Sequence, residues 1–513
     1  MGNPPKRWYG RTPRSAPTKK FIESRKDTIM KPDAEKKLIG RRNFLKAAAV
    51  LPALGAVSYK AQGIGPVKTG IVGTGMEGRI LISLCDPKFV YLTALCDIRP
   101  DNRALGLEML KKPELGHNPN PRVYEKYDDM LNDSELEAVI IATPFFLHGP
   151  MALQALQAGK HVFVEKTMAY TIGECREMIR LAKTKGLNLQ VGHQRFYNPL
   201  YWDAHRMIQE GLLGEIHHIR ALWHRNTDWN YWTYFRKMVP AELQAPLRAM
   251  DPTRYGYPDL QHLVNWRWYE AYSRGLWTEL CSHQIAVANW FLGSIPTAVY
   301  ATGGKFKSEE TQNELYLEYL SEFQTKKKYS DTDAVDFDAY RERLKGYSRD
   351  DRDIEDHIYA IFEYPGYRTV TYSCIQSNSV DQYYEHIMGT RGSLILSNEN
   401  ESYLFWEPGW NEESAQKAAK EEKTTQVDVV KEDAGQSAFA AHVSQEATGK
   451  GGASGMAPTD PYRFELQGFA HTIRNGAPNL CDGTKGVQAA LTCFAGQESL
   501  KHKQRIEIAP LSV

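Results

Sequence analysis

The chain has 513 residues, of which 42% are hydrophobic and 24% charged, and its net charge is +1. A chain of this length folds as two or more domains with ample core, and its balanced charge gives no reason to expect nucleic acid or an anionic membrane surface as a partner. The seven cysteines are odd in number and form no Cys-x-x-Cys pair, so neither a disulfide framework nor a structural metal site is expected.

Residues 1–62 are predicted to be a leader. Arg41 and Arg42 stand before Phe44-Leu45-Lys46, and a short apolar run follows at 47–57. A twin arginine before such a run resembles a twin-arginine export signal, and the run is too short for an ordinary membrane span. We expect an exported, periplasmic protein with no membrane span in its mature form. The alternative is an amphipathic surface helix on a cytoplasmic protein.

From Val67 the sequence alternates between strand and helix patterns. A strand at 67–72 is followed by Gly73-Thr74-Gly75-Met76-Glu77-Gly78 and a helix to about Leu84. In a G-x-G-x-x-G turn the first glycine permits the tight turn, the second lets a pyrophosphate approach, and the third lets helix and strand pack closely. The phosphates are expected at the N-terminus of the helix, where N–H groups are free.

A second strand at 90–96 ends at Asp97, and a helix follows at about 100–110. An acid about 20 residues after the last glycine bonds the adenosine ribose hydroxyls of a dinucleotide. Asp97 therefore favours NAD over NADP, whose 2′-phosphate it repels. Arg99 lies close to Asp97 in the sequence, so NADP stays an alternative cofactor.

Buried strands at 138–142, 161–164 and 187–191, with helices at 149–158 and 171–185 between them, complete the pattern of a doubly wound parallel sheet. The α/β Rossmann domain is assigned to 66–195. Ligands bind beyond the carboxyl ends of such strands. The predicted cofactor-binding residues are Gly73, Thr74, Gly75, Met76, Gly78, Asp97, Arg99, Thr143, Pro144, His148, Glu165, Lys166 and His193.

The second domain is assigned to 196–508 and is predicted to be α+β, on a mainly antiparallel sheet with one helical face. Helices are expected at 199–210 and 277–292, and strands at 215–223, 298–302, 358–364, 369–376, 384–388 and 393–396. A charged stretch at 305–352 is predicted to be a helical insertion, and 411–459 a mobile surface loop. The last helices, at about 461–475 and 484–500, are expected to pack back on the first domain.

Several short motifs follow one another in a specific order. They are the glycine turn, Ala142-Thr143-Pro144 with His148, Glu165-Lys166, Gly192…Arg195…Asn198-Pro199, Gly214-Glu215-Ile216 and Gly275…Glu279…His283. In this order they resemble the glucose–fructose oxidoreductase / inositol dehydrogenase / MocA family. The resemblance covers roughly 67–303 and 355–508. It implies a homodimer or homotetramer formed through the second-domain sheet.

The resemblance also implies that Lys166 lies between nicotinamide and substrate. The chain departs from the family at three points: Thr167 replaces the proline of Glu-Lys-Pro, Glu279 replaces the aspartate of Asp-x-x-x-His, and Ala286 stands where a later aspartate is usual. Oxidising a hydroxyl needs a base for its proton while hydride leaves carbon. His283 is predicted to be the base and Lys166 to stabilise charge on the oxygen, with Glu279 orienting His283 or binding a hydroxyl.

The expected substrate is a small carbohydrate, polyol or glycoside. Candidate substrate residues are Arg195, Asn198, Arg225, Trp266 and Arg267, although a tryptophan serves core or interface packing as readily. Three functions stay open: an NAD(P)-dependent sugar dehydrogenase, including C3 oxidation of a glycoside; an NAD-dependent glycoside hydrolase that uses transient oxidation and elimination; and a non-catalytic sugar-binding protein.

Overall fold

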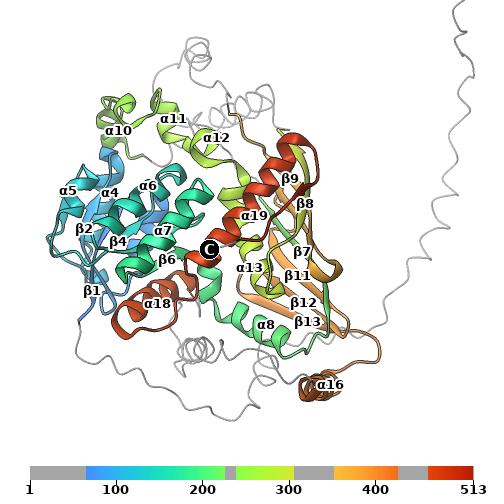
Figure 1. The fold of residues 1–513 in the computed structure, drawn as a ribbon. Coiled ribbons are helices and arrows are strands. Elements are labelled where there is room, and N and C mark those ends of the chain that lie inside the picture. Colours follow the sequence, from blue (N-terminus) through green and yellow to red (C-terminus); the bar gives the residue numbers. More distant parts are fainter. Residues whose placement is uncertain (1–64, 226–238, 306–351, 426–459, 512–513) are drawn as a thin grey trace, which may run out of the picture. The chain divides into compact units, whose positions relative to one another are not determined.

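A computed structural model describes residues 65–225, 239–305, 352–425 and 460–511 (Figure 1). The predicted leader and nearly all of the predicted charged insertion lie outside these residues, as do Trp229 and Trp232. Within the described ranges, no helix has the length and apolar character needed to cross a membrane.

The first domain is built on a six-stranded parallel sheet with the order β3-β2-β1-β4-β5-β6, which confirms the predicted doubly wound sheet. All strands except β3 were located from the sequence; β3 is a three-residue strand that the polar loop around it concealed. The strands are β1 (Val67–Val72), β2 (Val90–Cys96), β3 (Arg122–Tyr124), β4 (Ala138–Ile141), β5 (His161–Glu165) and β6 (Leu189–Gly192). The helices are α3 (Met76–Leu84), α4 (Pro100–Leu110), α5 (Tyr127–Leu131), α6 (His148–Gln157) and α7 (Ile172–Lys185).

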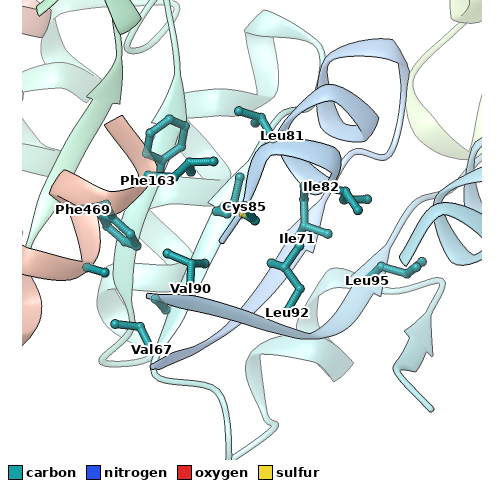
Figure 2. Close-up of a cluster of buried hydrophobic side chains, with 14 of the residues drawn as sticks. Val67, Ile71, Leu81, Ile82, Cys85, Val90, Leu92, Leu95, Phe163 and Phe469 are labelled. Atoms are coloured by element: carbon teal, nitrogen blue, oxygen red, sulfur yellow. The ribbon is translucent and has the colours of Figure 1, made fainter. Parts of the chain in front are cut away.

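The core of this domain forms because its strands are apolar on both faces, as a parallel sheet covered by helices requires. Figure 2 shows side chains from β1, β2 and α3 packed together, among them Ile71, Leu81 and Leu92. Phe469, from the late helix α18 (Pro461–Asn475), joins this core and meets Phe163 edge to face at 5.9 Å. The end of the chain therefore packs on the first domain, as predicted.

The second domain is built on an eight-stranded sheet with the order β13-β12-β11-β7-β10-β9-β8-β14. The pair β7–β10 is parallel and the other recorded pairs are antiparallel, which confirms the mainly antiparallel sheet. Its strands are β7 (Ile216–His224), β8 (Ala298–Gly304), β9 (His357–Tyr364), β10 (Arg368–Ile375), β11 (Tyr383–Gly389), β12 (Gly392–Ser397), β13 (Glu401–Trp406) and β14 (Ile506–Glu507).

One face of this sheet is covered by helices. Along β9, Ile358, Ala360 and Phe362 are buried, whereas Tyr359 and Ile361 are exposed. The buried side faces α13 (Ser282–Leu292) and the long helix α19 (Gly483–His502), which also touches α7 and β6 (Figure 1). The remaining helices are α8 (Pro199–Gln209), α10 (Ala241–Arg248), α11 (Leu260–Val264), α12 (Glu270–Ser273) and α16 (Glu412–Thr425).

Strands β13 and β14 and helices α10, α11 and α12 were not predicted, and two predicted segments have a different structure. The predicted loop at 411–459 begins with α16, because its alanine, lysine and glutamate residues are strong helix formers as well as polar; residues 426–459 lie outside the described ranges. The predicted helix at 277–292 opens with a π-helical turn, Trp277–Cys281, before α13. Such turns occur often at functional sites, and this one contains Glu279.

Candidate active site

The glycine turn has the geometry of a dinucleotide cradle. Gly73 has φ of +84°, and a Cβ there would lie 2.5 Å from the carbonyl oxygen of Ala142. A Cβ on Gly78 would lie 2.0 Å from the carbonyl oxygen of Gly73. At Gly75, by contrast, the nearest protein atom to an added Cβ is 3.8 Å away. Protein packing therefore demands the outer two glycines, while Gly75 leaves open the approach that a pyrophosphate needs.

Asp97 is buried beside this turn and is held by its own chain. One carboxylate oxygen accepts the Thr74 N–H at 2.7 Å, and the other accepts the Arg99 N–H at 2.8 Å. Burial raises the pKa of Asp97, and these two N–H donors oppose the rise. A carboxylate has about four acceptor positions, so Asp97 keeps capacity for ribose hydroxyls. The Thr74 N–H itself serves Asp97.

Arg99 is engaged by a neighbouring acid. Its guanidinium forms a two-pronged ion pair with Asp101, with nitrogen–oxygen distances of 3.1 and 2.5 Å, and both side chains are almost fully buried. A fork-to-fork pair of this kind is strong and directional. Asp101 thus largely neutralises the positive charge of Arg99, which was the reason for keeping NADP as an alternative cofactor.

The end of β4 is braced by a histidine. The ring nitrogens of His148 lie 2.8 Å from the Thr167 carbonyl and 3.0 Å from the Thr143 carbonyl, so this side chain ties the end of β4 to the segment after β5. Burial lowers the pKa of His148. The Thr143 hydroxyl is buried and has no partner among the described residues, and Pro144 directly precedes the 3₁₀ turn η3 (Phe145–Leu147).

Three carboxyl groups gather at the end of β5. Glu165 and Glu465 are buried, and Glu77, from inside the glycine turn, acts electrostatically on both. Burial first, and then the neighbouring carboxyl groups, raise the pKa of Glu165 and of Glu465 well above the usual range. One oxygen of Glu165 accepts the Lys166 N–H at 3.1 Å, whereas the other has no partner among the described residues. This cluster can hold a proton beside Lys166.

Lys166 connects the two domains. Its Nζ donates to the Glu279 carbonyl oxygen at 2.6 Å, and the Thr167 hydroxyl donates to the Thr278 carbonyl at 3.0 Å. Both carbonyls belong to the π-helical turn. The Lys166–Thr167 peptide bond is cis. The two hydrogen bonds fix the lysine at the boundary between the β5 end and the second domain.

His283 and His193 face each other beyond the strand ends. Their rings lie 6.0 Å apart at 88°, and Trp223 of β7 lies 5.5 Å from His283. Both nitrogens of His193 and Nδ1 of His283 are buried without a partner among the described residues. Burial, followed by the charges of Lys166 and Arg195, lowers the pKa of His193 to about 3 and the pKa of His283 well below its usual value. Both imidazoles are therefore neutral near pH 7.

Arg195 is anchored to the second-domain sheet. Its guanidinium binds Glu385 of β11 at 2.5 Å and Glu399 at 2.8 Å, and the Tyr201 hydroxyl donates to Glu385 at 2.7 Å. Its Nη2 atom is buried without a partner within the described ranges. Asn198 caps α8 through the Leu200 N–H and donates to the Glu399 carbonyl. Arg195 therefore joins the two domains and keeps one donor without a partner among the described residues.

The other predicted substrate residues lie around the π-helical turn. The Glu279 carboxylate accepts from Arg267 at 2.8 Å, and Arg267 stacks over Trp266 at 4.3 Å. Arg225 donates to Gln376 at 2.8 Å, and its charge acts on His283. Within the described ranges no hydrogen bond joins Glu279 to His283. The predicted orienting role of Glu279 therefore stays a prediction, because the π turn directs its carboxylate toward Arg267.

The structure thus brings Lys166, His193, His283, Arg195 and Arg225 together. Sequence reasoning missed Glu77, Glu465 and Tyr257, a buried second-domain tyrosine whose hydroxyl has no partner among the described residues. Glu77 stands inside the glycine fingerprint, where its charge was a visible signal. Glu465 occupies a buried position of α18 between Phe464 and Leu466, so a charge on the apolar face was a second signal. Nothing in the sequence marked Tyr257.

These residues fit NAD. The glycine turn and the start of α3 suit the pyrophosphate, and Asp97 retains capacity for the adenosine ribose. Polar atoms of Thr143, Glu165 and His193 that have no partner among the described residues line the strand ends where the nicotinamide half is expected. Because buried polar groups normally have partners, these atoms fit a bound ligand. When bound, NAD supplies the hydride acceptor.

Two family models match the chain. The model described as "Oxidoreductase family, NAD-binding Rossmann fold" matches residues 67–193, and the model described as "Oxidoreductase family, C-terminal alpha/beta domain" matches residues 205–508. Together they span most of the chain.

Curated relatives match a shorter stretch. An uncharacterized oxidoreductase of Schizosaccharomyces pombe is 36% identical over 156 residues, which is 29% of this chain and 40% of that protein. An alpha-N-acetylgalactosaminidase of Shewanella oneidensis is 29% identical over 219 residues, which is 37% of this chain and 47% of that protein. Glycosyl hydrolase family 109 proteins of Shewanella baltica match over the same length. The chain thus spans less than half the length of these relatives.

Solved structures resemble nearly the whole fold. A levoglucosan dehydrogenase in complex with NADH and levoglucosan is 17% identical, with a TM-score of 0.58 over 87% of this chain and 100% of the other. A scyllo-inositol dehydrogenase from Lactobacillus casei with NAD(H) and scyllo-inositol is 19% identical, with a TM-score of 0.52 over the same shares. At these identities the likeness establishes a common fold.

Proposed function

The chain belongs to the Gfo/Idh/MocA family of NAD-binding oxidoreductases, and from this premise we propose that it moves a hydride between NAD and a hydroxyl-bearing carbon of a carbohydrate or polyol. One observation carries the proposal: beyond the strand ends of the dinucleotide domain, Lys166 and the Nδ1 of His283, which has no partner among the described residues, converge. The solved structures with levoglucosan and scyllo-inositol support this substrate class.

The chain's own residues have distinct tasks in this proposal. The neutral imidazole of His283 accepts the proton of the substrate hydroxyl, and the Lys166 ammonium donates a hydrogen bond to the same oxygen. The charges of Lys166 and Arg195 that lower the pKa of His283 also oppose its keeping the proton. The proton therefore leaves His283 after each turnover. Trp223, beside His283, offers an apolar face to a sugar ring.

The test is a panel of free sugars and polyols with added NAD, followed through NADH formation. Mass spectrometry of the natively purified protein, before and after denaturation, shows whether NAD co-purifies. NADH formation with at least one polyol supports the dehydrogenase. If Lys166→Ala and His283→Ala leave the protein's biological role unchanged, the dehydrogenase proposal fails. The chain is then a non-catalytic sugar-binding protein.

A glycoside hydrolase is a second candidate, favoured by the family 109 relatives and the alpha-N-acetylgalactosaminidase. Such an enzyme oxidises and re-reduces its substrate within one cycle, so NAD is not consumed. Release of an aryl group from an aryl glycoside without net NADH supports the hydrolase. Stoichiometric NADH with a free sugar supports the dehydrogenase.

We also propose that the chain is exported through its twin-arginine leader, on the strength of Arg41 and Arg42 before a short apolar run. A fusion of residues 1–62 to a reporter that is active only after export tests this directly. Replacement of both arginines by lysine is expected to retain the reporter in the cytoplasm, and an unchanged distribution sinks the proposal.

A homodimer or homotetramer is proposed through the open face of the second-domain sheet. Tyr300 of β8 pairs with Ile361 of β9, and both side chains, with Tyr359, are exposed there at 45%, 49% and 47%. An exposed apolar patch on a sheet marks an interaction surface. Light scattering of Ile361→Lys is expected to give a smaller assembly than the wild type; equal masses contradict this interface.

A further inference from the structure

A segment of the second domain reaches the loops of the first domain around Asp97. Residues 239–273 contain α10, α11 and α12 and have their own small core of Val239, Leu247 and Val264. Helix α10 packs on α4, which begins just after Asp97, and α12 packs on the turn η3 after β4 (Figure 1). The loops that follow β2 and β4 flank the glycine turn. The segment therefore spans the side of the cleft where the adenosine half of a dinucleotide is expected.

Tyr257 is a polar residue of this segment that faces the Rossmann loops. Its side chain is only 1% exposed, and its hydroxyl has no partner among the described residues. Its ring meets Phe146 of η3 edge to face at 5.8 Å and lies 4.8 Å from the Tyr272 ring. The charges of Asp97 and Arg99 act on its hydroxyl, and burial raises the pKa of this phenol, which stays protonated.

A buried hydroxyl without a partner is unfavourable, and the tyrosine hydroxyl is both donor and acceptor. The group expected beside it is the adenosine ribose, whose hydroxyls Asp97 is placed to accept. The ribose supplies the acceptor that the Tyr257 hydroxyl lacks. The ring contacts with Phe146 and Tyr272 fix the direction of that hydroxyl.

We propose that residues 239–273 form a cover over the adenosine half of the NAD site, and that the Tyr257 hydroxyl binds the adenosine ribose beside Asp97. Leaving the site then requires the cover to separate from α4 and η3, so NAD exchanges slowly. This cover, which rests on the proposed function because it needs bound NAD, suits a cofactor that is retained between turnovers.

The test compares release of NADH from wild type, Tyr257→Phe and the control Tyr367→Phe, whose side chain is fully exposed. Each protein is loaded with NADH, excess NAD is added, and release is followed through NADH fluorescence. Loss of one buried hydrogen bond of about 1.4 kcal/mol predicts release about tenfold faster in Tyr257→Phe and unchanged release in Tyr367→Phe. Equal rates in all three proteins overturn the role of Tyr257.

Hydrogen exchange tests the cover separately. NAD is expected to slow amide exchange in 241–264 of the wild type by reducing opening of the segment. Unchanged exchange there, with NAD bound, overturns the cover. A wild-type protein that binds neither NAD nor NADH overturns the proposed function itself, so the two failures are distinguishable.

Discussion

The two halves of the cofactor cleft differ in whether their polar atoms have hydrogen-bond partners. On the adenosine side, Thr74, Asp97 and the Arg99–Asp101 pair bond to one another within the first domain. On the reaction side, both nitrogens of His193 and Nδ1 of His283 are buried and unpaired within the described ranges. The first-domain residues of the adenosine half hold one another in place, whereas the reaction half is complementary to a ligand that is yet to bind.

This difference separates residues whose polar atoms are already paired from residues whose polar atoms lack a partner, although a motif search treats both alike. A buried polar group without a partner is unfavourable by about 1–3 kcal/mol, so the reaction side gains when a ligand supplies the missing bonds. The first-domain residues of the adenosine side already bond to one another, so they gain few hydrogen bonds from a ligand. This side sets the choice of cofactor by charge. Variants on the reaction side should change turnover and pH response, and variants on the adenosine side should change cofactor choice.

Lys166→Ala is expected to have the largest effect. It removes the ammonium that stabilises charge on the substrate oxygen, and removal of one such donor reduces kcat by about 10³-fold, or about 4 kcal/mol. NADH affinity, measured by fluorescence titration, is expected to change little. Lys185→Ala, at the exposed end of α7, serves as the control. A turnover in Lys166→Ala within tenfold of the wild type contradicts the assignment of Lys166 to the reaction side.

Arg195 lies on the reaction side, and Arg195→Met tests whether its main role is in folding stability or in substrate binding. The substitution leaves Glu385 buried without its cation, and breaking a buried pair in this way costs about 3 kcal/mol of folding stability. Urea unfolding measures this loss. Arg180→Met removes an ion pair with Glu177 that is largely exposed, and no measurable change is expected there. If Arg195→Met keeps full stability but loses turnover, the free Nη2 serves the substrate instead.

The sequence located the adenosine half well, because the glycine turn is a local pattern. Gly73, Gly78 and Asp97 are fixed by backbone geometry within one β-α-β unit, and their roles follow from spacing. The Rossmann strands could be predicted because they too are local patterns. Uninterrupted apolar runs such as 138–141 indicate strands of a sheet that is buried on both faces.

The reaction half depends on contacts across domains, which spacing does not encode. Lys166 reaches the Glu279 carbonyl because the chain makes a π turn there, and a helical i, i+4 pattern predicts a different direction for the Glu279 carboxylate. Tyr257 reaches the Asp97 region from a segment 160 residues later in the chain, counted from their numbers. Both placements follow from tertiary packing, to which a single sequence gives no direct access.

His193→Phe tests the pH response of the reaction side. The folded-state pKa of about 3 lies below the unfolded value near 6.5, so the folded state binds fewer protons between these values. The neutral histidine therefore favours folding above pH 6.5, and this stability is lost as the pH falls through that window. Between pH 7 and pH 5 the loss is about 2 kcal/mol.

His193→Phe is expected to remove that part of the acid sensitivity, as measured by urea unfolding at both pH values. The control is His217→Phe, on an exposed histidine of β7, which should retain the wild-type difference. An identical pH dependence in the wild type and His193→Phe means that His193 is not held neutral by its surroundings.

Asp101→Asn is the smallest expected change and tests the adenosine side. The substitution keeps the volume of the side chain but removes the charge that neutralises Arg99. An arginine beside the ribose accommodates the 2′-phosphate of NADP, so the ratio of Kd values for NADPH and NADH should shift toward NADPH by about tenfold, or about 1.4 kcal/mol. Adding Arg99→Ala should abolish the shift, because no guanidinium then remains to meet the phosphate. A shift that survives in the double variant assigns the effect to the negative charge of Asp101 itself, which then acts on the 2′-phosphate by repulsion without any contribution from Arg99.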